Sequence, residues 1–149
     1  PNVREAWNFN LNLYQTDPDR FFKDLIIFLA MKTPERFRLH VSGDFPDVAY
    51  FERIADVFAS YPNTSVLAFT KRFDYPLWEA PANMKIVLSM WPGLDIPAYA
   101  DRYPLAWMEG DARRPVAGPY ISCPGSCVEC EFVCWHGVSP ELPVVFKKH

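Results

Sequence analysis

The sequence has few of the features that identify common enzyme classes. It contains 6 glycines in 149 residues, and no glycine-rich phosphate loop, metalloprotease helix or nucleophile elbow is present. Its best apolar run, LIIFLAM (25–31), is too short to cross a bilayer, and no signal peptide is visible. Lys and Arg never form a run longer than two residues, so the charge gives no clear footprint for nucleic acid. We therefore expect a cytoplasmic protein without a membrane partner.

Cysteine is missing from the first 122 residues, and all 4 cysteines lie within twelve residues in the spacing C-x3-C-x2-C-x3-C. Disulfides between such near neighbours would close only small loops and would leave the rest of the chain without a cross-link. Thiolates gathered in a loop that contains Pro and Gly are instead typical of metal binding. We therefore predict a metal-binding loop over 121–137, with ligands Cys123, Cys127, Cys130 and Cys134.

The spacing also bears on which metal is bound. Zinc sites usually combine two separated pairs of ligands, whereas iron–sulfur clusters are often held by one compact run of cysteines. A single run favours a 4Fe-4S iron–sulfur cluster, and zinc stays open as the alternative.

Hydrophobic residues make up 50% of the chain and aromatic residues 16%, which indicates one domain over 1–149 with a real core. Helical spacing of apolar residues is seen over 16–34 and 47–62, and more weakly before residue 14. Strand-like segments occupy 37–43, 65–71, 85–91 and 105–109. This alternation predicts an α/β fold. We expect a partial, half TIM-like barrel or a parallel sheet of about four to five strands with flanking helices, closed by the C-terminal four-cysteine loop.

Alternation along the strands predicts their two faces. A bulky apolar face should pack under the helices, and a smaller, partly polar face should line the inside of the half-barrel. The bulky sets are Phe37 with Leu39, Leu67 with Phe69, and Ile86 with Leu88.

Polar residues gather where the predicted strands end, which is where parallel α/β folds build ligand sites. The candidate ligand-binding residues are His40, Ser42, Gly43, Asp44, Thr70, Lys71 and Ser89. Among them Asp44 is preferred, because Gly43 lets the backbone approach a ligand closely. Two of these residues also have ordinary explanations, since His40 suits a hydrogen-bonded core histidine and Lys71 a solvated lysine.

Several short segments, taken in order, resemble the phage-type gene product 88 family over nearly the whole chain. They are RLHVSGDF (38–45), LAFTKR (67–72), NMKIVLSMW (83–91), the cysteine run ending in CW (134–135), and VVFKKH (144–149). Members of that family occur in phages and bacteria. Its βα barrel layout and cysteine motifs are similar to the radical SAM superfamily.

The resemblance implies a role for the end of the first strand. Ser42-Gly43-Asp44 looks like a variant of the Gly-Gly-Glu stretch that holds the amino group of S-adenosylmethionine in that superfamily. It also implies an upstream cysteine motif, which lies before the point where this chain begins. Cys123, Cys127 and Cys130 have the C-x3-C-x2-C spacing of radical SAM enzymes, but Cys134 adds a fourth ligand that would close the site.

We therefore expect an iron–sulfur protein that resembles part of a radical-SAM-like enzyme, with S-adenosylmethionine or another small molecule as a possible partner. A closed site suits an auxiliary or structural centre, so the chain by itself is not expected to carry out radical chemistry. The alternative is a zinc-stabilised interaction module of a phage or mobile element, which binds a protein or nucleotide partner at the sheet edge without catalysis.

Overall fold

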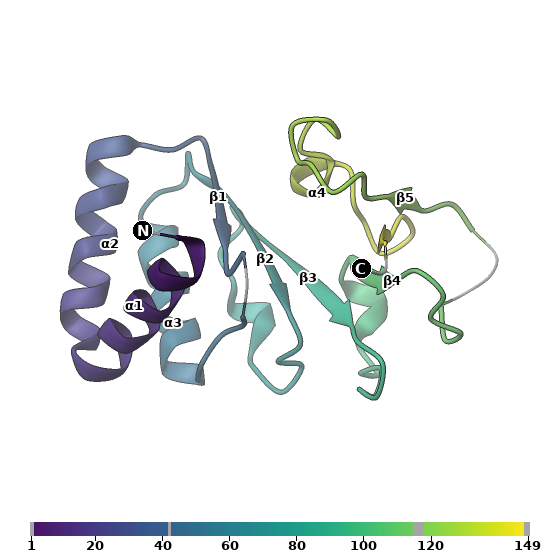
Figure 1. The fold of residues 1–149 in the computed structure, drawn as a ribbon, viewed down its shortest axis with the longest axis horizontal. Helices are drawn as coiled ribbons and strands as arrows, with labels where there is room; N and C mark the ends of the chain where they lie inside the picture. The colour runs from purple at the N-terminus through teal and green to yellow at the C-terminus, as the bar shows by residue number, and fades with distance from the viewer. Residues whose placement is uncertain (1, 42, 115–117, 148–149) are drawn as a thin grey trace.

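The computed structural model describes residues 2–41, 43–114 and 118–147. Its centre is a six-stranded sheet in which every neighbouring pair of strands is parallel. The sheet curls into an open half-barrel (Figure 1). Its strands, in their order across the sheet, are β1 (Arg36–Leu39), β2 (Ser65–Thr70), β3 (Met84–Met90), β4 (Leu105–Met108), β6 (Val144–Phe146) and β5 (Ile121–Ser122).

The α/β class, the half-barrel and the flanking helices are confirmed, and the strand count is corrected from about four to five to six. The two strands that the sequence did not reveal, β5 and β6, have 2 and 3 residues. Strands this short carry no readable alternation. They form because β6 pairs with β4 and offers its other edge to β5.

The first two helices form a hairpin whose boundaries follow from local signals. Helix α1 (Val3–Thr16) begins with a capping box in which Asn2 and Glu5 exchange side-chain to backbone hydrogen bonds. Helix α2 (Pro18–Lys32) begins with Asp17, which accepts a hydrogen bond from the Arg20 amide, and with Pro18 in its first turn. The helix expected over 16–34 is therefore confirmed.

Helix α3 (Val48–Ala59) is capped by Asp47, whose side chain accepts a hydrogen bond from the Tyr50 amide at 2.7 Å. Its apolar stripe is buried against the sheet together with α2. The two later crossovers, rich in proline, contain only the short 3₁₀ turns η1 (Leu77–Glu79) and η2 (Ala100–Arg102). Helix α4 (Val133–His136) is a single turn inside the cysteine segment.

Two buried clusters lie on opposite faces of the sheet. The larger one joins α2 and α3 to side chains that include Leu39, Ala68 and Leu88. The smaller one lies on the inner face of the half-barrel, beneath the C-terminal segment, and includes Leu67 and Cys134. The C-terminal segment therefore takes the place of helices on that face.

The expected face of β2 was wrong. Leu67 and Phe69 belong to the inner cluster, whereas Val66 and Ala68 pack under the helices. β2 is apolar on both faces because the C-terminal segment covers the face opposite the helices, so side-chain bulk could not identify the helical side. For β1 and β3 the expected faces hold, since Phe37, Leu39, Ile86 and Leu88 all lie on the helical side.

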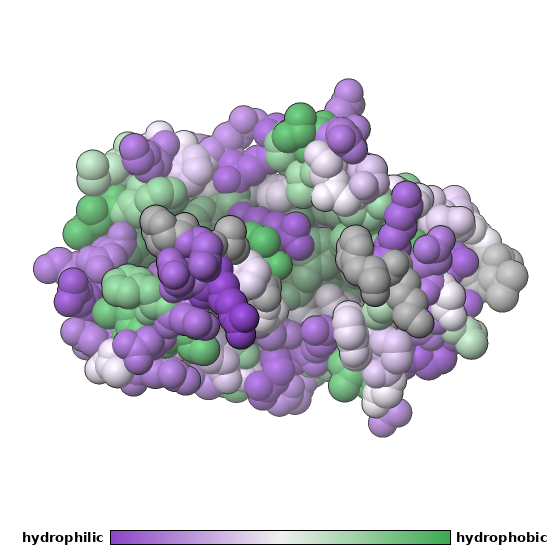
Figure 2. Space-filling model, viewed as in Figure 1, coloured by the Kyte–Doolittle hydropathy of each residue, from purple (hydrophilic) through white to green (hydrophobic). Residues whose placement is uncertain are grey.

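In space-filling form the same view is hollowed between the helical part and the C-terminal part of the chain (Figure 2). Within the described residues no helix is long and apolar enough to span a membrane.

Candidate metal centre and strand-end site

The cysteine segment is a compact turn attached to the edge of the sheet. Cys123 directly follows β5, and its amide donates to the Val145 carbonyl at 2.8 Å. The chain then folds back on itself, because the Phe132 amide donates to the Cys127 carbonyl at 2.9 Å. Glu131 and Phe132 have positive φ angles of 51° and 58°, a conformation that non-glycine residues adopt rarely. The surrounding contacts therefore hold this turn in a costly backbone shape.

Cys134 anchors the segment to the inner face of the sheet. It is buried in the inner cluster with Leu67 and Val144. The next residue, Trp135, donates from its indole to the Ser65 carbonyl at 3.3 Å and packs edge-on against Phe132. The other three cysteines are only partly buried. Among the four candidate ligands, Cys134 is therefore the one that is also a core residue.

The four cysteines are free thiols, and no disulfide joins them. The pKa of Cys134 is raised to about 11, mainly by burial and in smaller part by the charges of the three other cysteines. Each of the other three predicted ligands is therefore near enough to Cys134 to interact with it electrostatically. In the part of the chain that the structure describes, however, no three His, Cys, Asp or Glu side chains are grouped as metal ligands. To bind one centre, the sulfur atoms would have to move closer together.

Two cations on the inner face lie close to Cys134. In the sheet register Leu67 pairs with Arg38 on one side and with Lys85 on the other, and Leu67 itself packs in the cluster of Cys134. The positive charge of Arg38 opposes the rise in the pKa of Cys134. Burial lowers the pKa of Lys85, and the charge of Cys134 opposes that effect. Sequence reasoning missed both residues, because only the strand register places them beneath the cysteine segment.

The predicted strand-end site is partly assembled. Asp44 Oδ1 accepts hydrogen bonds from the Phe45 amide at 2.8 Å and from the Thr70 hydroxyl at 2.7 Å. Asp44 Oδ2 accepts from the Lys71 amide at 2.6 Å. The structure thus brings Asp44, Thr70 and Lys71 together where β1 and β2 end. Their hydrogen bonds fasten the loop after β1 to β2, and ligand binding at this edge stays a prediction.

The other predicted strand-end residues take different positions. Thr70 is in register with Leu88, and both lie on the helical face of the sheet. Ser89 follows Leu88 in β3 and therefore points to the other, inner face. The Lys71 ammonium lies 4.6 Å from the centre of the Trp91 ring. Gly43 has a φ of 88°, which a side chain would strain. Ser42 lies outside the described residues.

His40 ends β1 early. The expected strand over 37–43 is observed only as Arg36–Leu39, because His40 has a positive φ of 49°. Its ring turns toward the helices, where Nε2 lies 3.2 Å from the Tyr50 hydroxyl and the ring packs edge-on against Phe45. Burial lowers the pKa of His40 to about 4, so this histidine is neutral at physiological pH.

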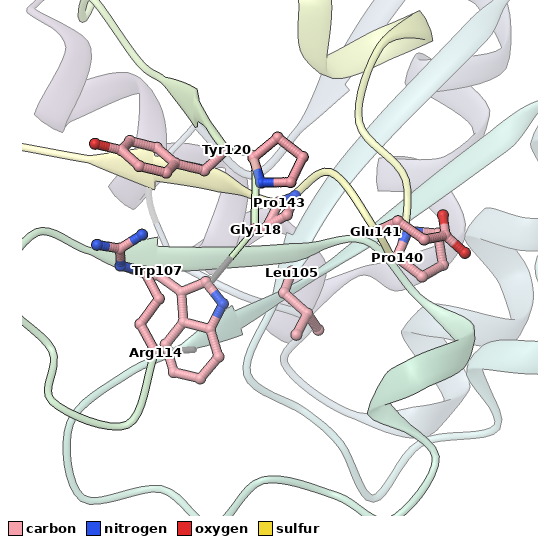
Figure 3. A pocket seen from close by; sticks show the side chains of 9 residues that line it. Leu105, Trp107, Arg114, Gly118, Tyr120, Pro140, Glu141 and Pro143 are labelled. Atoms are coloured by element: carbon pink, nitrogen blue, oxygen red, sulfur yellow. The ribbon is translucent and has the colours of Figure 1, made fainter. Parts of the chain in front are cut away.

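Two hollows were not foreseen from the sequence. A cavity of about 160 Å³ lies beside β4 (Figure 3). It is lined by Leu105, Trp107, Arg114, Gly118, Pro119, Tyr120, Pro140, Glu141 and Pro143. A shallower one of about 380 Å³ lies between the η1 and η2 regions and is lined by residues such as Trp78 and Arg102. Neither hollow brings together side chains with an evident chemical role. Neither is lined by residues of the strand-end site.

The fold and this segment together define a class, namely an α/β half-barrel protein whose inner face is covered by a cysteine-rich segment. The family model described as gene product 88 matches residues 1–93. The chain therefore belongs to the gene product 88 family. Among curated proteins and among solved structures, the comparisons find no significant match.

Proposed function

We propose that this gene product 88 protein is a metal protein in which Cys123, Cys127, Cys130 and Cys134 hold an iron–sulfur cluster. The observation that supports it best is electrostatic and geometric. Four free thiols lie within residues 123–134, of which Cys123 and Cys134 pack in the inner cluster, and the three other thiols raise the pKa of the buried Cys134. Gathered thiols that hinder one another's ionisation are stabilised when a cation neutralises them.

The residues around the segment fit a metal centre. The buried Nε of Arg38 has no hydrogen-bond acceptor among the described residues, which suits a nearby anionic sulfur. Phe132 and Trp135 cover part of the turn with aromatic surface, and such shielding limits solvent access to a centre. The sulfur atoms are not grouped as ligands, so binding would be coupled to closure of the turn over 123–134.

A bound cluster would supply electron transfer or structural cross-linking. The four thiolates would be its ligands, and Cys134 would tie it to the core. Arg38 and Lys85 would offset its negative charge. Four protein ligands would leave no open coordination position, which favours an auxiliary or structural role over direct reaction with a substrate.

A finer version of the proposal is that the chain forms part of a radical-SAM-like enzyme. It is supported by the parallel half-barrel and by the polar residues that meet where β1 and β2 end. Asp44 already accepts three hydrogen bonds there, so an ammonium group would have to use its remaining lone pairs. If S-adenosylmethionine binds, it should raise the melting temperature of the longest native form of the protein. Asp44→Asn should remove that rise.

Metal analysis tests the main proposal. Protein purified without oxygen should be brown, contain iron and sulfide, and lose its colour on oxidation. Cys127→Ser should lose the metal, because it removes one of the four thiolate ligands. Cys127 is only partly buried, so the substitution leaves the core intact. Glu129→Gln, an exposed change in the same turn, is the matched control and should retain it. Wild-type protein that holds neither iron nor zinc would refute the proposal.

Zinc is the second candidate. A colourless protein with one equivalent of zinc would favour the interaction module, in which the metal fixes the C-terminal segment against the sheet. The same Cys127→Ser and Glu129→Gln pair distinguishes specific from adventitious zinc. Specific zinc is lost only in the cysteine variant.

A further inference from the structure

The cysteine segment covers the inner face of the sheet near the amino ends of its first strands. The Arg36 guanidinium, at the start of β1, lies 4.6 Å from the centre of the Phe132 ring. The Trp135 indole donates to the carbonyl of Ser65, at the start of β2. This cover therefore lies at the end opposite to the carboxyl edge, where parallel α/β folds bind ligands.

The carboxyl half of the same face has an aromatic floor. Phe69 of β2 packs edge-on against Phe146 of β6, with the ring centroids 5.6 Å apart, and both residues are only partly buried. This contact joins the helical part of the chain to the C-terminal part, between which the molecule is hollowed (Figure 2). Trp91 directly follows β3 and is 48% exposed. Aromatic surface is therefore accessible at the carboxyl ends of the strands.

Two cations border this aromatic surface. The Arg38 guanidinium lies 5.1 Å from the centre of the Phe69 ring, and the Lys71 ammonium lies 4.6 Å from the centre of the Trp91 ring. Among the described residues, neither cation forms an ion pair with a carboxylate, and neither side chain donates a hydrogen bond. Their positive charges are therefore available to an anionic ligand.

The inner face also differs in charge from the molecule as a whole. The chain carries a net charge of −3, but none of the six described strands contains Asp or Glu. The Lys and Arg residues within these strands are Arg36, Arg38 and Lys85, and all three project inward. Asp44 reaches the strand ends from the helical side, where it accepts a hydrogen bond from Thr70. The inner face of the sheet therefore attracts anions.

The strand register places the two unpaired cations on either side of Phe69. Arg38 is in register with Leu67, and Lys71 lies four residues beyond Leu67, about 13 Å along an extended chain. Ser89 of the neighbouring strand projects onto the same face and adds a hydroxyl donor. An anionic group between the cations can therefore meet two long, charged side chains and one neutral donor.

We propose that this open half of the inner face binds a nucleoside phosphate. Arg38 and Lys71 would hold the phosphate, and the base would pack on Trp91. Two cations and a hydroxyl suit the several acceptor oxygens of a phosphate, and an exposed aromatic ring suits a base because every base has a flat π-face. The inference goes beyond the proposed function and requires no metal.

Calorimetry on the full chain tests the ligand class, with AMP, adenosine and inorganic phosphate as probes. AMP should bind about 10- to 100-fold more tightly than adenosine, because only AMP makes charge-assisted hydrogen bonds to the cations. It should also bind more tightly than inorganic phosphate, which has no base to stack. Wild-type protein that does not bind AMP would overturn the inference.

Side-chain variants test the location of the site. Lys71→Met and Arg38→Met should each weaken AMP binding by about tenfold or more, and Arg38→Lys should recover part of the loss because it keeps the charge. Trp91→Leu should weaken AMP by about 5- to 100-fold and leave inorganic phosphate unchanged. Lys71 and Trp91 are exposed, so their variants should melt at the wild-type temperature.

Lys32→Met is the matched control. It removes an exposed cation at the end of α2, away from the inner face, and should change AMP binding by less than about twofold. If Lys32→Met weakens AMP as much as Lys71→Met does, the binding reflects overall charge, and the inference is wrong.

A short single-stranded oligoadenylate identifies the source of the nucleotide. If it binds more tightly than AMP and loses affinity in the Lys71→Met and Trp91→Leu proteins, the site takes one unit of a strand. If AMP binds more tightly, the ligand is a free nucleotide. Both results retain the nucleoside phosphate as the ligand.

The two proposals fail separately because metal content and AMP binding are measured independently. Protein that binds AMP but holds neither iron nor zinc refutes only the proposed function. Protein that holds metal but does not bind AMP refutes only this inference.

Discussion

The carboxylate of Asp44 accepts a hydrogen bond from the hydroxyl of Thr70 at 2.7 Å. The two residues are 26 positions apart in the chain, and their contact joins the loop after β1 to the end of β2. Thr70 is fully buried, and its oxygen also accepts a hydrogen bond from the Arg72 amide. The strand-end edge is therefore organised by partly buried hydrogen bonds before any ligand is considered.

Thr70→Val should destabilise the protein by about 1–3 kcal/mol. Valine has nearly the same shape but removes the acceptor of the Arg72 amide and one of the two hydrogen bonds to Asp44 Oδ1, which keeps only the bond from the Phe45 amide. Urea unfolding followed by circular dichroism measures the change. Asp101→Asn, at an exposed site, should change the free energy of unfolding by less than about 0.5 kcal/mol. Equal stability of Thr70→Val and wild type would show that this contact does not hold the loop.

Asn83, at the turn before β3, is a second partly buried residue whose side chain joins distant segments. Its side-chain amide nitrogen lies within hydrogen-bond distance of the carbonyls of Phe58, Tyr61 and Thr64, at 2.9–3.1 Å. Asn83→Asp should cost about 2–4 kcal/mol at neutral pH, because it places a carboxylate against carbonyl oxygens. The loss should shrink as the pH falls toward 4 and the carboxyl group becomes a donor.

Asn63→Asp supplies the comparison for that experiment. It makes the same chemical change at an exposed site in the loop before β2, between Tyr61 and Thr64, and should cost less than about 0.5 kcal/mol. If both variants unfold alike, the hydrogen bonds of Asn83 contribute nothing net.

The sequence predicted those parts of the fold that depend on near neighbours. The start of α2 was readable because its cap and first turn are consecutive residues, Asp17 and Pro18. The four longer strands were readable from alternation and from the β-rich segments themselves. The cysteine run was likewise visible, since its spacing is local.

Features that depend on distant contacts were not readable. β5 and β6 exist only because they pair with each other and with β4. The inward orientation of Leu67 depends on the C-terminal segment that covers it. Arg38 resembled any strand arginine, and only the register beside Leu67 places it near Cys134. The end of β1 at His40 depends on a positive φ that sequence patterns do not predict.

His40 should make stability depend on pH. Its pKa is lowered from the ordinary 6.5 to about 4, mainly by burial, while the charge of Asp44 acts weakly in the opposite direction. As the pH falls, His40 therefore takes up a proton near pH 6.5 in the unfolded chain but only near pH 4 in the folded chain. The contribution of the neutral ring is complete above pH 6.5 and is lost as the pH falls toward 4. We expect a loss of about 2–3 kcal/mol from this group between pH 7 and pH 4.5.

His40→Asn isolates that contribution, because Asn tolerates the left-handed backbone at this position. The variant should lose less stability than wild type over the same pH range in urea unfolding. His136→Asn, at an exposed site, should leave the wild-type pH dependence unchanged. A His40→Asn protein with the full wild-type loss would assign the acid sensitivity to other groups.

Cys134 and Cys127 should separate the structural role of the cysteine segment from its metal role. In metal-free protein, Cys134→Ser places a hydroxyl among apolar side chains such as Leu67 and Val144 and should cost about 1–3 kcal/mol. Cys127→Ser, at a partly exposed position, should cost less than about 0.5 kcal/mol. Thermal unfolding in the presence of a chelator measures both values.

Adding metal should then expose a deficit relative to wild type at both positions. If all four thiols are ligands, wild type gains stability through preferential binding to the folded chain, by about 2.7 kcal/mol at a free metal concentration 100 times the dissociation constant. Both variants should lose most of that gain, although only one of them was destabilised without metal. Cys127 thus carries the decisive result, because its substitution is nearly silent in the metal-free fold. A Cys127→Ser protein that gains as much stability from metal as wild type would exclude that thiol from the ligand set.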